Sequence, residues 1–155
     1  MFNPITVASA AKTAARAELR TKKVLSLTAK QYRLKQEVKD ADKSAEATAT
    51  RIARLKWETD QAASNGNPDA TGIKERNDKS IDALTKEADG STTRIAELKK
   101  EIAGFQGKID AVTSGETKID YDSILNLADA FIHEATKNAF ASGEFEKEKA
   151  ASESL

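Results

Sequence analysis

Residues 64–72 read SNGNPDATG, a cluster of turn formers that contains a glycine able to stop a helix and a proline unable to continue one. On both sides of this cluster, apolar residues recur with the period of a helix. We therefore expect the chain to reverse direction at residues 64–72, between two long helical arms.

Both arms follow a heptad repeat, in which positions a and d face a partner helix. In the first arm these positions are Val24, Leu27, Gln31, Leu34, Val38, Ala41, Ala45, Thr48, Ile52, Leu55 and Ala62. In the second arm they are Ile81, Leu84, Ala88, Ser91, Ile95, Leu98, Ile102, Phe105, Ile109 and Val112. A repeat sustained over about five heptads in each arm is typical of a coiled coil.

Residue numbers show whether the arms can pair antiparallel, because facing a and d positions should then have a constant sum. That sum is 136 for ten successive layers, from Val24 with Val112 to Leu55 with Ile81, and it pairs Leu34 with Ile102. At about 1.5 Å per residue, the first arm would be roughly 60 Å long. The sequence thus predicts an all-α fold built on an antiparallel coiled-coil hairpin at residues 24–112.

Ion pairs flanking the seam would favour the same register weakly, and Lys30 with Glu101 and Glu37 with Arg94 are the two we expect. The middle of the seam contains only small residues, which favours either close approach of the two backbones or a weakly held segment. These residues are Ala41, Ala45, Thr48, Ala88 and Ser91.

Three glycines lie on the outward face of the second arm, at Gly90, Gly104 and Gly107. Each costs about 1 kcal/mol in a helix relative to alanine. They indicate local weakness of the helix or, near Gly104 and Gly107, a place where another helix packs closely.

Further helices are expected at the open end of the hairpin. Residues 1–23 form a basic, alanine-rich helical segment, and residues 119–140 form an amphipathic helix whose wide apolar stripe includes Phe131 and Ile132. We expect this last helix to bury its stripe there, with Leu25 and Tyr32 as a docking strip on the first arm. Residues 141–155 have too little apolar content to fold alone and predict an acidic, flexible tail.

The composition excludes several classes of function. The 155 residues fit one domain and include no Cys and a single His, so thiol chemistry, disulfides and a histidine metal cluster are excluded. No phosphate-binding loop, dinucleotide fingerprint or metalloprotease motif is present, and His133 has no partner nucleophile. We predict a protein that is not an enzyme, with no cofactor, no metal and no small-molecule substrate.

The chain shows no run of apolar residues long enough to cross a bilayer and no secretory signal at its start. We therefore expect a soluble protein, located in the cytoplasm or within a virion or other macromolecular assembly. The few bulky apolar residues near the N-terminus also disfavour binding to a membrane surface.

A basic segment at residues 12–35 is the candidate site for anions. It has eight basic residues against one acidic residue, whereas residues 114–155 have nine acidic residues against four lysines. The basic side chains could therefore bind nucleic acid or the acidic last third of the same chain. They are Lys12, Arg16, Arg20, Lys22, Lys23, Lys30, Arg33 and Lys35.

Trp57 falls on an outward heptad position near the turn, where no intramolecular partner is evident. Its ring could lie along its own helix over Ala53, or it could anchor another protein, since tryptophan is enriched at interface hot spots. The candidate protein-interaction residues are accordingly Trp57, Leu25, Tyr32, Phe131 and Ile132.

The predicted architecture resembles the helical hairpins that serve as structural parts of large assemblies, such as small virion and tail components of bacteriophages and hairpin adaptors of export machines. That resemblance implies a non-enzymatic structural or assembly protein, present in several copies as a homo- or hetero-oligomer. A monomeric adaptor or chaperone-like binding module is the alternative, and a nucleic-acid binder acting through residues 12–35 is the third.

Overall fold

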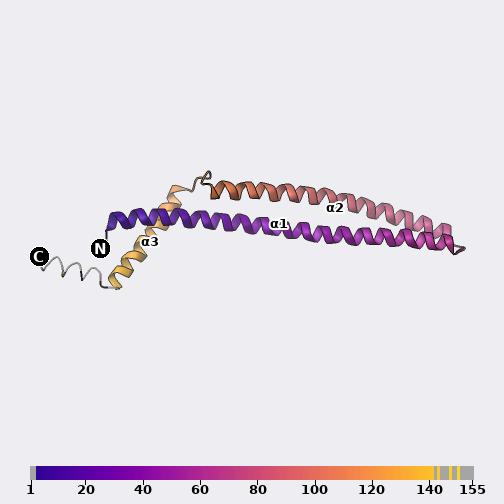
Figure 1. The fold of residues 1–155 in the computed structure, drawn as a ribbon, viewed down its shortest axis with the longest axis horizontal. Helices are drawn as coiled ribbons and strands as arrows, with labels where there is room; N and C mark the ends of the chain where they lie inside the picture. The colour runs from indigo at the N-terminus through magenta and orange to yellow at the C-terminus, as the bar shows by residue number, and fades with distance from the viewer. Residues whose placement is uncertain (1–2, 142, 144–146, 148–149, 151–155) are drawn as a thin grey trace. The chain divides into compact units, whose positions relative to one another are not determined.

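A computed structural model of the chain describes residues 3–141 together with Gly143, Lys147 and Ala150. These residues form three α-helices, α1 (Pro4–Ser64), α2 (Ala70–Thr113) and α3 (Tyr121–Ala141), and the described part of the chain contains no strand (Figure 1). The all-α fold class is therefore confirmed.

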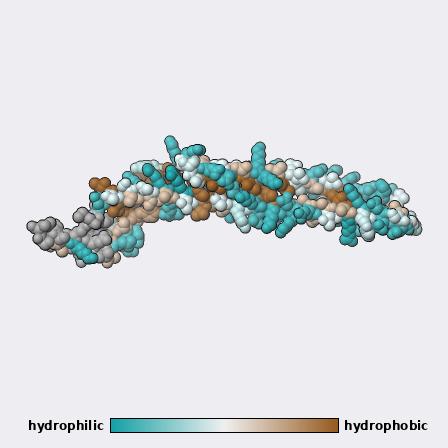
Figure 2. All heavy atoms as spheres, in the orientation of Figure 1, coloured by the Kyte–Doolittle hydropathy of each residue, from teal (hydrophilic) through white to brown (hydrophobic). Residues whose placement is uncertain are grey.

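The chain divides into two compact units. The hairpin unit is Ala29–Gly107, and the terminal unit combines Met1–Thr28 with Lys108–Leu155. In the hairpin unit α1 and α2 run antiparallel and side by side (Figure 1). In the space-filling view, brown apolar atoms show between the teal polar side chains of these two helices (Figure 2).

The predicted seam is confirmed by burial, because every a and d position of the two arms is buried or half-buried. Leu98 and Val112 have the largest side chains that are almost fully buried, each 1% exposed. The small middle of the seam is also shielded, and Thr48 there is buried. This favours close backbone approach over a weakly held segment.

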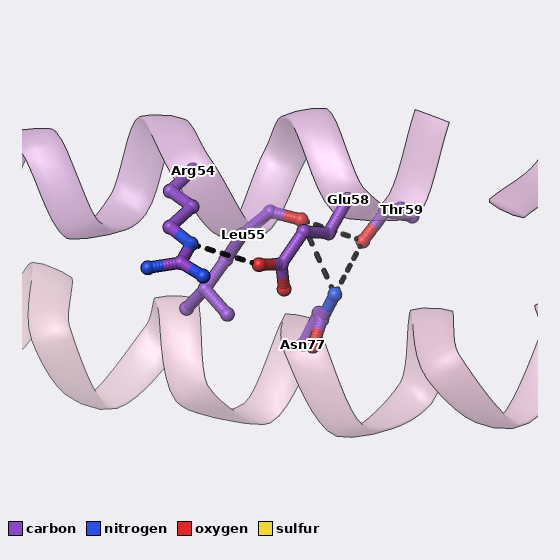
Figure 3. Close-up of polar contacts among 5 residues, drawn as sticks. All are labelled: Arg54, Leu55, Glu58, Thr59 and Asn77. Atoms are coloured by element: carbon purple, nitrogen blue, oxygen red, sulfur yellow. Dashed lines mark hydrogen bonds and ion pairs between the residues drawn. The ribbon is translucent and has the colours of Figure 1, made fainter. Parts of the chain in front are cut away.

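Two polar groups within the hairpin unit fix the register. Gln31 is buried, and its Nε2 donates to the carbonyl of Ile102 at 3.3 Å and to Oε1 of Gln106 at 3.0 Å. Asn77 Nδ2 donates to Thr59 Oγ1 at 3.0 Å and to the carbonyl of Leu55 at 3.2 Å (Figure 3). Residues 59 and 77 also sum to 136, so the register continues one layer beyond the last predicted pair, Leu55 with Ile81.

Of the two expected ion pairs, one is confirmed. Arg94 Nη2 lies 3.4 Å from Glu37 Oε2 across the seam. The prediction of a pair between Lys30 and Glu101 is wrong, because Glu101 lies 3.8 Å from Arg94 Nη1 on its own helix. The Arg94 guanidinium therefore takes the carboxylate that was assigned to Lys30.

The turn is shorter than the predicted 64–72. Gly66 adopts a φ of 64°, and the amides of Gly66 and Asn67 donate to the carbonyls of Ala63 and Ala62 at 3.3 and 3.0 Å. This is a Schellman cap, which needs a left-handed residue and therefore favours glycine. Asn67 Oδ1 then accepts from the amide of Asp69 at 2.9 Å, and α2 begins directly afterwards at Ala70.

The N-terminal segment is not a helix of its own, in contrast to the expectation for residues 1–23. Asn3 caps α1 by accepting from the amides of Ile5 and Thr6 at 3.0 and 3.3 Å, and Pro4 occupies the first helical position. No glycine or proline follows until Gly66, so nothing stops the helix before the turn.

The last helix begins one residue after its cap. Asp120 Oδ2 accepts from the amide and the hydroxyl of Ser123, each at 3.0 Å, and α3 ends at Ala141. Most of the predicted acidic tail, residues 141–155, lies outside the described residues.

The core of the terminal unit is made by small residues of α1 against α3. Ala11, Ala15, Ile124 and Ala128 are buried, with Ala15 0% exposed. Five half-buried residues pack against them: Leu19, Ile119, Leu127, Phe131 and Ile132. The alanines allow α3 to approach the α1 backbone closely, which explains how helices with few bulky side chains form a core.

Candidate protein-contact surfaces

The start of α1 carries a face that no other described element covers. A shallow hollow of about 630 Å³ lies over this face, and Ile5 within it is 81% exposed. Its lining residues are Ile5, Thr6, Ser9, Ala10, Thr13, Ala14 and Ala17. In a chain with 32% charged residues, this face has no charged side chain.

A second hollow, of about 410 Å³, adjoins this face and shares Ala10 and Ala14 with it. It lies between α1 and α3 and is lined by Val7, Ala10, Ala11, Ala14, Phe131 and Ala135. We call the two hollows together the open apolar surface. Exposed apolar patches of this kind mark contact sites for proteins or other apolar partners.

One hydroxyl group on this surface, that of Thr13, already has a hydrogen-bond acceptor within its own helix. Thr13 Oγ1 donates to the carbonyl of Ser9 at 3.1 Å within the same helix. A partner could therefore cover Thr13 without leaving that donor unpaired, which removes a usual cost of burying a polar group.

The predicted contact residues Phe131 and Ile132 are largely used inside the chain. Both are half-buried and pack against the core of the terminal unit, and Phe131 also lines the open apolar surface. Sequence periodicity identified the apolar stripe of α3, but not which part of it stays uncovered.

Leu25 and Tyr32 do not serve as the docking strip for the last helix. Within the terminal unit α3 packs against Ala11 and Ala15, and Leu25 remains 62% exposed. Tyr32, in the hairpin unit, is 61% exposed. Both therefore stay available as contacts for another molecule.

Trp57 is 61% exposed and lines a hollow of about 440 Å³ at the turn end of the hairpin unit. Ala62 and Ile73 give this hollow an apolar floor beside the Trp57 ring. Polar side chains surround it, including Arg76, whose Nη2 pairs with Asp69 Oδ2 at 3.0 Å. An aromatic side chain within a polar rim is the usual composition of an interface anchor.

The basic side chains of residues 12–35 are mostly exposed, and the structure shows one ion pair among them, between Lys22 Nζ and Glu18 Oε1 at 2.8 Å. No described acidic residue of the C-terminal third pairs with them; the four glutamates of the tail lie outside the described residues. Arg16 and Arg20 share a hollow with Lys118 and Tyr121, two residues that the sequence analysis did not select.

His133 lies exposed on α3. Among the residues that the structure describes, no three His, Cys, Asp or Glu side chains are grouped closely enough to hold a metal ion. No helix of the described chain is both long and apolar enough to cross a membrane.

Comparison of the chain with models of known protein families, with curated proteins and with solved structures found no significant match.

Proposed function

We propose that this chain is a non-enzymatic structural subunit that assembles with further copies of itself. The observation that carries the proposal is the open apolar surface, an uncharged face of α1 with Ile5 81% exposed and an apolar groove beside it. A partner that covers this surface would remove apolar atoms from water. This burial stabilises the contact by about 25 cal/mol for each Å² of apolar surface that is buried.

A second copy suits this surface better than an unrelated protein. Binding to a different protein is usually made specific by complementary charges on the two surfaces. The open apolar surface has no charged side chain. The small side chains of Ala10, Ala14 and Ala17 would let the same face of another α1 approach closely. Such a contact is isologous, because each copy offers the same residues to the other.

Trp57 is proposed as a second contact, separate from the first. A chain with a single isologous surface stops at a dimer, whereas a second surface allows larger assemblies. We therefore propose a multi-copy particle, such as a virion or tail, as the setting of this protein. A helical hairpin suits this role because it offers much surface per residue.

The test is sedimentation velocity of the purified protein over a concentration series. The proposal predicts a mass that grows with concentration in the micromolar range, and a substitution Ala14→Glu that weakens association by more than about tenfold, since it would bury an unpaired charge. Ala49→Glu, an equal change at an exposed alanine of α1 in the hairpin unit, should have little effect. A strictly monomeric species at all concentrations would favour the adaptor alternative and overturn the proposal.

A further inference from the structure

A small basic hollow lies in the terminal unit and shares no lining residue with the open apolar surface. It has a volume of about 230 Å³ and is lined by Arg16 and Arg20 of α1, Gly115, Lys118 and Ile119 of the α2–α3 connection, and Tyr121 and Ile124 of α3. Three cations and an aromatic ring from three segments therefore meet at one place. We call it the basic pocket.

Local structure brings these cations together. Arg16 and Arg20 are four residues apart and lie on the same face of α1. The chain turns sharply after α2, with Gly115 at a φ of 81° and the amide of Thr117 donating to the carbonyl of Ala111 at 3.1 Å. Arg20 Nη2 lies 3.5 Å from the position a Cβ on Gly115 would occupy, so the turn packs against this guanidinium.

The positive charge of the pocket is not neutralised by the described chain. Arg16, Arg20 and Lys118 form no ion pair with any described residue. Three acidic residues adjoin the pocket lining in the sequence, Glu116, Asp120 and Asp122, and none of them forms an ion pair with these cations. Asp120 directs Oδ2 to the amide and hydroxyl of Ser123 as the cap of α3. Three adjacent cations without counter-charges attract an anion.

The residue types indicate which anion. Guanidinium groups form paired hydrogen bonds with phosphate oxygens, and lysine adds a point charge. Tyr121 is 54% exposed beside these cations, so a large part of this aromatic side chain is accessible to a ligand. Phosphate contacts combined with an aromatic platform are typical of proteins that bind single-stranded nucleic acid, whose unpaired bases can stack.

We infer that the basic pocket binds a phosphate of single-stranded nucleic acid, with a neighbouring base stacked on Tyr121. The inference rests on Arg16, Arg20, Lys118 and Tyr121 and does not depend on the proposed self-assembly. A structural subunit with such a pocket would hold a nucleic-acid strand against the assembly that it builds.

Fluorescence anisotropy with a labelled oligothymidylate of about 12 nucleotides tests the inference, since that length lies within the usual site size of single-strand binders. Wild-type protein should bind at low salt, and Arg16→Gln/Arg20→Gln should weaken binding at least tenfold. Tyr121→Leu should weaken it by roughly tenfold, because the base would no longer stack on an aromatic ring. Removing an arginine that neutralises one phosphate should also reduce the salt dependence of log K by about 0.7.

The control is Arg51→Gln/Arg54→Gln, which removes two exposed arginines of α1 in the hairpin unit, outside the basic segment 12–35, and gives the same net charge. It should bind nearly as wild type does. All five altered side chains are solvent-exposed, and circular dichroism melting checks that each variant keeps the fold. Equal weakening by the control, or no binding of the oligonucleotide at low salt, would overturn the inference. So would a wild-type preference for anionic vesicles over the oligonucleotide.

Discussion

Asn77 Nδ2 lies 3.0 Å from Thr59 Oγ1, and the two residues face each other across the seam of the hairpin unit. The Thr59 hydroxyl in turn donates to the carbonyl of Leu55 at 2.9 Å, and Asn77 donates to the same carbonyl (Figure 3). This closed set of hydrogen bonds places a polar layer within the seam, in addition to the one made by Gln31. Polar residues at such positions fix the register of a coiled coil at some cost in stability.

The first prediction is a measurable coupling between these two side chains. Asn77→Ala and Thr59→Val should each lower the free energy of unfolding, and the double variant should lose less than the sum, by about 1 kcal/mol, because both remove the same hydrogen bond. Urea unfolding of the four proteins measures it.

Thr50→Val is the matched control, since Thr50 Oγ1 bonds only to the carbonyl of Glu46 in its own helix, at 3.0 Å. Its effect should add to that of Asn77→Ala. If the losses in free energy of unfolding from Thr59→Val and Asn77→Ala are strictly additive in the double variant, the hydrogen bond across the seam is absent in solution.

The second prediction concerns the outward glycines of α2. Apart from the adjoining residues of α2 itself, no atom lies within 4 Å of the position that a Cβ would take at Gly90, Gly104 or Gly107, so no other described helix packs on them. Gly90→Ala and Gly104→Ala should each raise the free energy of unfolding by about 1 kcal/mol, through helix propensity.

Gly66→Ala serves as the contrasting variant, because its φ of 64° suits glycine, and it should instead destabilise the protein. The comparison is made by urea unfolding at a concentration where the protein is dissociated. Destabilisation by Gly104→Ala would indicate a close packing partner on that face of α2.

The third prediction tests how α3 is held. Ala15 is 0% exposed within the core formed with Ile124 and Ala128, so Ala15→Leu has no space for its added carbons. Overpacking of this kind costs about 1–3 kcal/mol. Hydrogen exchange should show reduced protection in Tyr121–Ala141 and unchanged protection in Ala29–Gly107, whereas Ala47→Leu at an exposed site should change neither. Full protection of α3 in Ala15→Leu would contradict this packing.

The fourth prediction uses the fluorescence of Trp57. Because Trp57 is the only tryptophan of the chain, all indole emission comes from this one side chain. In dilute protein its emission should be that of a water-exposed indole, because the ring is 61% exposed. Under conditions of assembly the emission should shift to shorter wavelength as the ring is covered. Trp57→Ala should weaken assembly and change the free energy of unfolding by less than about 0.5 kcal/mol. An emission that stays constant through assembly would exclude Trp57 as a contact.

The hairpin could be predicted because its signals are local and repeat many times. Each a and d position carries the same information, so an unexpected residue such as Gln31 does not change the result. The constant sum of 136 then shows which residue of the first arm faces which residue of the second. The turn was predictable because its signal, a cluster of turn-forming residues, is also local. Its exact limits were not predictable, because the sequence does not show which of Gly66 and Gly72 ends the first helix.

The surfaces of the terminal unit could not be predicted in the same way. The core contacts of Ala11 and Ala15 with α3 join residues more than 100 positions apart, and alanine gives no periodic signal in a helix as rich in alanine as α1. Lys118 and Tyr121 join Arg16 and Arg20 only because the chain turns at Gly115. The available signal in the sequence was Lys118, three residues after Gly115 in the connection that follows the second arm.

The contact between copies is tested most directly by a single cysteine on the open apolar surface, since the natural chain has none. Ala14→Cys places a thiol at the residue shared by both hollows, and Ala49→Cys places one at an exposed alanine of the hairpin unit. If two copies meet through this face, mild oxidation should convert Ala14→Cys rapidly to a disulfide-linked dimer and Ala49→Cys only slowly. Equal rates of crosslinking for the two variants, or no dimer from Ala14→Cys, would contradict self-assembly through the open apolar surface.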